Sequence, residues 1–171
     1  MARYEIHPER SEVRIEARSS IHPIDAVING LEGFLEVEVG EGGVLDLSVA
    51  PKGRLDLPVD RLTSGNALYD REMKRRIDAR KFRSITGELK EMKTAGDGGR
   101  YVVGGDVTFR GETRHFEDEM SFAVLDEKSV SLGGSHVFDI REFGMEPPKI
   151  MMLKVYPDVS VSVKIVAVTG G

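Results

Sequence analysis

The sequence predicts an all-β fold in which antiparallel strands form a closed barrel or a sandwich, and three observations predict it. Most of the chain alternates apolar and polar residues with period two, as strands with one buried face do. The gaps between these segments are short and rich in turn residues, for example 40–43, 96–99 and 110–112, which favours hairpins. Glycines such as Gly33 and Gly105 lie inside or beside strands, where they mark the bulges and bends that a barrel needs.

The alternation defines the expected strands in order. In 13–18, Val13, Ile15 and Ala17 share one face, and in 34–39 Leu35, Val37 and Val39 do the same. The remaining strands are expected at 44–49, 84–92, 100–109, 117–125, 129–138, 152–159 and 159–168. We see no linker or repeat, so residues 1–171 are expected to form a single domain.

One stretch, 66–82, has helical periodicity instead. Asn66 is a suitable N-cap, and Tyr69, Met73 and Ile77 fall on one face at a spacing of four. Between residues 66 and 83 there are seven Lys and Arg side chains against three acids. This basic face is explained by a solvated helix surface, by an anion site at the rim of a pocket, or by a nucleic-acid patch.

Composition narrows the function classes. The formal net charge is -5, which gives no support to nucleic acid or anionic lipid as the main partner, so we expect no nucleic-acid partner. The chain has no cysteine, which excludes disulfides and thiol catalysis. The N-terminus lacks the pattern of a signal peptide and no apolar run is long enough to span a bilayer, so we expect a cytoplasmic protein without stable membrane insertion.

No motif predicts a catalytic or metal site. The four histidines, His7, His22, His115 and His136, are not spaced as a metal pair on a helix. Ser135 and His136 are neighbours on an expected strand and therefore point to opposite faces. The acids at 117–119 fan over both faces of their strand, so the sequence does not show two carboxylates converging as acid-base catalysis requires.

An ordered set of motifs resembles the YceI-like family of lipocalin-like, polyisoprenoid-binding proteins. The opening "YEIHPERSEVRI" is similar to the family's Y-x-I-D-P-x-H-S-x-V-x-F start, with His7 and Arg10 as departures. The segments 66–85, 101–114, 138–145 and 158–167 resemble further family segments in the same order. An Arg-His pair that the family often has near Arg18 is absent, because Ser19 follows and His22 lies three positions later.

The resemblance implies a lipocalin-like β-barrel of about eight antiparallel strands, with a short helix near 66–80, that carries or stores a long apolar ligand of polyisoprenoid or isoprenoid-quinone type in its lumen. No cofactor is implied other than such a bound lipid, and a homodimer stays open. The residues expected to contact the lipid are Ile15, Leu35, Val37, Val107, Phe109, Phe122, Phe138, Phe143, Met73 and Ile77. The polar head is expected to meet Arg71, Arg75, Arg141, His22 or His136.

Two other classes stay open at this point. An enzyme of cyclase or isomerase type on the same barrel requires a buried polar group with a shifted pKa inside the cavity. A nucleic-acid module using the basic helix requires salt-sensitive binding through the Lys and Arg residues at 71–76.

Overall fold

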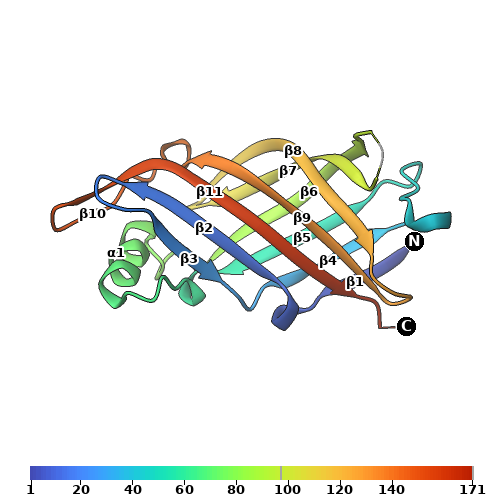
Figure 1. Ribbon diagram of the computed structural model, residues 1–171, viewed down its shortest axis with the longest axis horizontal. Coiled ribbons are helices and arrows are strands. Elements are labelled where there is room, and N and C mark those ends of the chain that lie inside the picture. Colours follow the sequence, from blue (N-terminus) through green and yellow to red (C-terminus); the bar gives the residue numbers. More distant parts are fainter. Residues whose placement is uncertain (97, 171) are drawn as a thin grey trace.

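The computed structural model describes residues 1–96 and 98–170, and it contains a closed, antiparallel β-barrel (Figure 1). Eight strands close the barrel: β1 (Ala2–Ile6), β4 (Glu32–Val37), β5 (Lys52–Pro58), β6 (Ser84–Thr94), β7 (Arg100–Phe109), β8 (Glu112–Val124), β9 (Ser129–Asp139) and β11 (Leu153–Val168). They pair in that order, and β11 returns to β1 through Glu5↔Val168 and Ile6↔Ala167. The all-β, lipocalin-like barrel with one helix is therefore confirmed.

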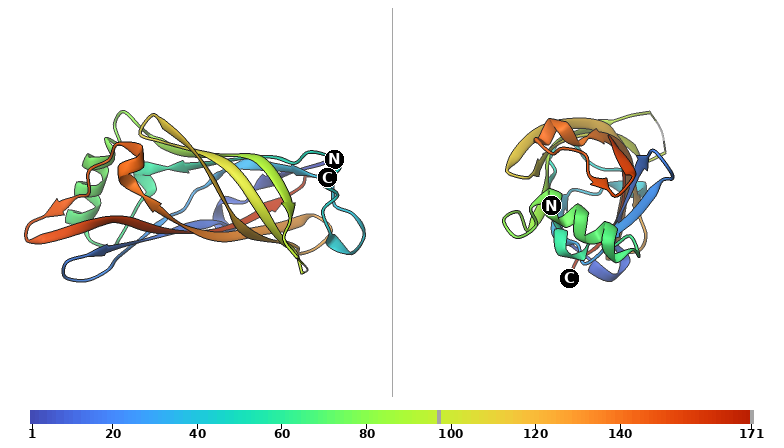
Figure 2. Two further views of the ribbon diagram at one scale, coloured as in Figure 1. Left: turned by 90° about the horizontal axis from the view of Figure 1, so that it is seen from above. Right: turned by 90° about the vertical axis from the view of Figure 1, so that its left-hand side faces the viewer.

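Three further strands extend one end of the barrel. β2 (Glu12–Ser19) continues along the edge of β11 beyond β1, and β3 (Ile24–Ile28) pairs with β2. The two-residue strand β10 (Lys149–Ile150) forms a hairpin with the start of β11. Both hairpins lie at the end that carries helix α1 (Ala67–Ile77), whereas the two chain termini lie at the opposite end (Figures 1 and 2).

Four short 3-10 helices connect the strands. They are η1 (Pro8–Arg10), η2 (Glu41–Gly43), η3 (Val59–Arg61) and η4 (Ile140–Phe143). Because each is a single turn, they redirect the chain at the ends of the barrel without adding a layer.

The strand predicted at 44–49 is wrong. The chain forms η2 just before this segment, with left-handed backbone at Gly42 and Gly43, and residues 44–49 then make one isolated bridge, Val39↔Leu45, followed by a turn. The alternation arises instead from a loop that turns Leu45 into the core at the termini end, where it is buried with Leu47 packed nearby. The predicted turn at 96–99 includes Asp97, which lies outside the described residues.

The strands predicted at 152–159 and 159–168 form one strand, β11. An irregularity in register between Val155 and Val159 on the β2 side accommodates Pro157, which cannot donate to a ladder. Glycines on β7 were expected to mark a bulge, and a bulge is present: it lies on the neighbouring strand β6, directly opposite Gly104 and Gly105. The β6–β7 register shifts between Leu89 and Glu91, and a side chain at Gly105 would come within 2.9 Å of the Glu88 carbonyl oxygen.

Helix α1 begins where the sequence predicts it. The side chain of Asn66 accepts hydrogen bonds from the backbone N–H groups of Leu68 and Tyr69, at 3.0 and 3.2 Å. Asp78, with φ 63°, ends the helix in the left-handed region. The predicted apolar face is confirmed, because Ile77 is buried, Met73 packs on the same core and Tyr69 packs on the base of the β10–β11 hairpin.

Candidate functional site

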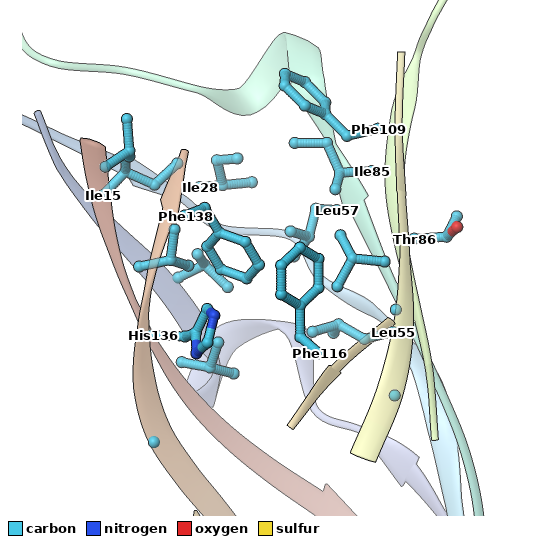
Figure 3. A pocket seen from close by; sticks show the side chains of 18 of the residues that line it. Ile15, Ile28, Leu55, Leu57, Ile85, Thr86, Phe109, Phe116, His136 and Phe138 are labelled. Carbon is cyan, nitrogen blue, oxygen red and sulfur yellow. The ribbon is translucent and has the colours of Figure 1, made fainter. Parts of the chain in front are cut away.

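The barrel encloses an elongated apolar cavity of about 380 Å³ (Figure 3). This volume lies within the 300–1,000 Å³ range of small-molecule pockets. Its wall includes inward-facing residues from both sides of the barrel, such as Ile15, Leu55, Ile85, Val107, Leu132 and Val161. In Figure 3 the side chains of Ile15 and Ile28 face those of Leu55, Leu57 and Ile85 across the cavity.

Strand alternation explains why the wall is apolar although charged residues occur on the same strands. Arg54, Glu88 and Asp106 fall in the opposite phase from their lumen-facing neighbours. Each contacts a partner on the same or an adjacent strand. Arg54 pairs with Asp56, Glu88 with Lys90, and Asp106 with His115. Thr86 likewise points away from the cavity in Figure 3.

The two ends of the cavity differ. At the termini end a core containing Tyr4, Leu45, Tyr101 and Phe122 fills the barrel. At the other end α1 lies across the opening (Figure 2), and Met73 and Ile77 complete the cavity wall. The helix is thus a cover over the cavity, with its apolar face inward.

An aromatic cluster narrows the middle of the cavity. Phe116 and Phe138 meet edge to face with ring centroids 4.7 Å apart, and Phe109 and Phe143 do so at 5.6 Å. Both geometries are those that aromatic pairs prefer. His136 joins the cluster, with its ring 4.6 Å from Phe138 and 5.3 Å from Phe116.

His136 forms the polar group of the cavity together with Asp118. Its Nδ1 lies 2.7 Å from Asp118 Oδ2, and both residues line the cavity. The hydrogen bond with His136 is the main reason that the pKa of Asp118 is lowered from its usual value. An ionised carboxylate only accepts, so Nδ1 donates and Nε2 is directed to other partners. Among the described residues no hydrogen bond to Nε2 is found.

The pair sits where the barrel wall is split. The β8–β9 ladder ends at Met120↔Gly134 in the described chain. Beyond that pair β8 stays paired with β7 from Glu119 to Glu112, and β9 stays paired with β11 as far as Asp139. Asp118 and His136 are the next inward-facing residues beyond that last pair. Their side chains are 49% and 29% exposed, so a small molecule can reach them.

The structure brings nine of the predicted contact residues to the cavity wall: Ile15, Leu35, Met73, Ile77, Val107, Phe109, His136, Phe138 and Phe143. Val37 and Phe122 lie instead in the core that fills the termini end. Their strand phase is inward, as predicted, but the barrel is solid at their level. Contact of the nine with a ligand stays a prediction.

The other predicted head-group residues do not line the cavity. His22 is held by Tyr69, whose hydroxyl lies 3.2 Å from Nε2, and by the Pro23 carbonyl. Arg141 pairs with Asp139 at 2.7 Å, and Arg75 pairs with Glu72. Arg71 is exposed on α1. That any of these four meets a polar head at the mouth of the cavity stays a prediction.

Sequence reasoning missed Phe116 and Asp118. The signal for Asp118 was present, since it alternates with Phe116, Met120 and Phe122 on β8. Asp118 was not selected because it is the middle residue of three consecutive acids, of which only Asp118 faces inward. The enzyme alternative requires a buried polar group with a shifted pKa in the cavity. The pKa of Asp118 is lowered, but its side chain is 49% exposed, so the pair does not meet this requirement.

A second histidine cluster lies on the outer face of the barrel. His115 contacts Asp106 and Glu91, each at 2.8 Å. The hydrogen bond with Asp106, followed by that with Glu91, raises the pKa of His115 above its usual 6.5. No group of three or more His, Asp or Glu side chains arranged to hold a metal ion was found among the described residues.

We expect the His115 cluster to make stability depend on pH. A raised pKa in the folded state means that the contribution is fully present below pH 6.5 and is lost as pH rises through the folded-state value. Replacing His115→Gln is thus expected to lower the melting temperature at pH 5.5 and to change it little at pH 9. Thermal unfolding of both proteins across this range checks the prediction, and an equal loss at both pH values contradicts it.

Fold and site together define a lipocalin-like barrel with an internal apolar cavity. The chain belongs to the YceI family, since a YceI-like domain matches residues 4–167. Comparison of the sequence with curated proteins gave no match.

Solved structures share the fold at low sequence identity. BcnA from Burkholderia cenocepacia is 15% identical with a TM-score of 0.77, covering 95% of this chain and 99% of that one. A polyisoprenoid-binding domain from Saccharophagus degradans is 9% identical with a TM-score of 0.77 and covers 99% of both chains. The YceI protein of Campylobacter jejuni is 11% identical with a TM-score of 0.70, covering 89% and 88%.

Proposed function

We propose that this protein binds a long isoprenoid lipid in the barrel and carries or stores it. The observation that carries the proposal is the elongated cavity, whose wall is apolar along both sides and whose ends are formed by a filled core and by α1. The description of the Saccharophagus degradans domain as polyisoprenoid-binding supports the same ligand class.

The hydrophobic effect is sufficient to drive such binding. Each buried methylene contributes about 0.8 kcal/mol, so a few isoprene units offset much of the cost of association. A branched hydrocarbon also suits a wall of Ile, Val, Leu and Phe, because it makes dispersion contacts without leaving polar groups unpaired.

The Asp118–His136 pair supports a neutral oxygen as the polar head of this lipid. His136 Nε2 accepts a hydrogen bond from a hydroxyl when the imidazole is neutral, and donates to a carbonyl when it is charged. The negative charge of Asp118 opposes a phosphate at the same place. Within the proposed class, we therefore favour an isoprenoid alcohol, quinol or quinone over an isoprenyl phosphate.

Native mass spectrometry of the purified protein, followed by lipid extraction, tests the proposal. We expect a co-purified isoprenoid, or uptake of an added isoprenoid quinone at a ratio of one per chain. If neither appears, the carrier proposal is wrong. Added linear isoprenyl diphosphate serves as the comparison ligand for the head-group preference.

We expect His136→Leu to weaken binding of a farnesol-type alcohol about fivefold, since a net hydrogen bond contributes about 1 kcal/mol. Binding of squalene, a hydrocarbon without a polar head, is expected to stay unchanged. Competition for a fluorescent isoprenoid probe measures both affinities. An equal loss for the two ligands means that His136 acts through packing alone and contradicts the head-group assignment.

A further inference from the structure

The β10–β11 hairpin lies at the extreme end of the molecule (Figure 1), and it exposes two large apolar side chains. Lys149 pairs with Lys154 and Ile150 with Leu153, which leaves Met151 and Met152 as the two turn residues. Met151 is 81% exposed and Met152 87%, the highest values among the large hydrophobic residues of the described chain. Ile150 and Leu153 are buried and fix the base of the hairpin to the body.

The turn sequence is not one that folding alone favours. Met151 has φ 54°, a left-handed conformation at the first turn position, where two-residue hairpins favour Gly, Asn or Asp. A side chain held there costs conformational energy, and such strain accumulates where function requires it. The two methionines therefore stabilise neither the turn nor the core.

A second loop adds to the same apolar surface. The backbone N–H of Ser20 donates to the Lys154 carbonyl at 2.9 Å, and the Lys154 N–H donates to Ser20 Oγ at 3.0 Å. These bonds hold the β2–β3 loop beside the hairpin, and Ile21 in that loop is 65% exposed. We call Ile21, Met151 and Met152 the apolar tip.

Positive charge surrounds the apolar tip. Lys149 and Lys154 face each other one residue pair before the methionine turn, and no ion pair to either ammonium group is found among the described residues. α1 at the same end belongs to the segment with seven Lys and Arg against three acids, whereas the whole chain carries -5. The nearest acids along the chain are Asp25, which lies in β3, and Glu146, which lies in the segment before β10. The basic α1 segment and the two lysines are therefore located at the tip end, although the whole chain is acidic.

The cavity reaches the base of the tip. Ala17 and Ile24, in the strands that flank the β2–β3 loop, line the cavity, and so do Pro148 and Val155 on either side of the β10–β11 hairpin. A surface that receives the apolar tip would thus lie directly against the α1 end of the cavity.

We propose that the apolar tip docks reversibly on an anionic phospholipid bilayer, with Met151, Met152 and Ile21 at the acyl boundary and Lys149 and Lys154 at the lipid phosphates. Apolar side chains at the interface and cations near the headgroups are the two terms that drive peripheral binding. Docking at this end brings the cavity to the membrane that holds isoprenoid lipids. The role of docking in lipid transfer rests on the proposed function, whereas the docking itself does not depend on which lipid is carried.

Sedimentation with vesicles tests the docking. We expect binding to phosphatidylcholine vesicles containing about one third phosphatidylglycerol, weaker binding to pure phosphatidylcholine, and loss of the difference at high salt, where charges are screened. Lys149→Gln with Lys154→Gln is expected to weaken binding about 25-fold, because each lysine near the membrane surface contributes a factor of about five. Lys128→Gln, in the β8–β9 turn at the opposite end, is the matched control and is expected to change nothing.

The apolar contribution is tested by Met151→Gly with Met152→Ser. This pair suits a two-residue turn, so the hairpin is expected to fold at least as well while binding to anionic vesicles falls at least tenfold. Val44→Ser, an exposed apolar residue at the termini end, is the control. Because the chain has no cysteine, Met152→Cys also gives a single site for an environment-sensitive dye, whose emission is expected to shift to the blue on anionic vesicles.

Each outcome decides the proposal. Absence of wild-type vesicle binding, or full binding by the Gly-Ser variant, overturns it. If the tip instead joins two copies of this chain, light scattering will show a wild-type dimer that the Gly-Ser variant converts to a monomer, and this too overturns it. The amount of bound lipid is measured on the same samples by native mass spectrometry. A protein that carries lipid but does not bind vesicles contradicts only the docking proposal. A protein that binds vesicles but takes up no lipid contradicts only the carrier proposal.

Discussion

The double variant Ile15→Trp with Leu55→Trp is expected to lose about 100-fold in affinity for an isoprenoid lipid while remaining folded. The two side chains face each other across the cavity (Figure 3), and both contribute to its wall. Displacing about four methylenes of ligand from the cavity removes roughly 3 kcal/mol of burial, which corresponds to this factor. Titration with a fluorescent isoprenoid, supported by native mass spectrometry, measures the loss.

A matched pair of substitutions separates filling of the cavity from the mere addition of tryptophan. Val44→Trp with Val137→Trp adds the same side chains at exposed positions, and we expect wild-type affinity. The chain contains no native tryptophan, so the emission of the introduced residues also reports whether they are sheltered from water. Unchanged lipid affinity in the Ile15–Leu55 variant would mean that the ligand binds elsewhere.

Gly33→Ala is expected to destabilise the fold by about 4 kcal/mol or more, at the upper end of single-residue effects. Gly33 has φ 143°, and a Cβ there would lie 1.9 Å from the backbone carbonyl oxygen of Arg54 on the paired strand β5. Neither backbone can yield without breaking the β4–β5 ladder. A loss of this size lowers the melting temperature by about 10 °C in a chain of this length.

Gly87 provides the control for that prediction. It lies on β6, also pairs with Leu55, and has ordinary extended backbone. A Cβ at Gly87 would be 3.9 Å from Leu55 Cβ, a normal van der Waals distance. We expect Gly87→Ala to change the free energy of unfolding by less than about 1 kcal/mol. Similar melting temperatures for the two alanine variants would show that Gly33 is not constrained as its geometry indicates.

Local patterns predicted the elements because their causes are local. The N-cap at Asn66 and the apolar face through Ile77 need only a few neighbouring residues, and both are confirmed. The failure at 44–49 has the same origin. Alternation reports which side chains are buried, and a loop that packs Leu45 into an end of the barrel produces the same pattern as a strand.

The net charge of the chain does not reveal where its charged residues lie in the fold. The whole chain is acidic, which argues against an anionic partner when charge is treated as one number. The fold places the basic α1 segment, Lys149 and Lys154 at the end opposite the termini. The proposed docking surface at the apolar tip rests on this location of the charges.

The sequence by itself determined the alternating strands other than β1, β3, β5 and β10, together with the capped helix, the position of the bulge glycines and the family. Tertiary structure decided at which level the barrel is hollow, which separates Phe138 on the cavity wall from Phe122 in the end core. It also brought Asp118 and His136 together beyond the last β8–β9 pair and joined the β10–β11 hairpin to the β2–β3 loop through Lys154 and Ser20. Period-two alternation states only that a residue faces inward. What it meets there depends on the register and closure of strands distant in the chain, and this long-range pairing leaves no local pattern to read.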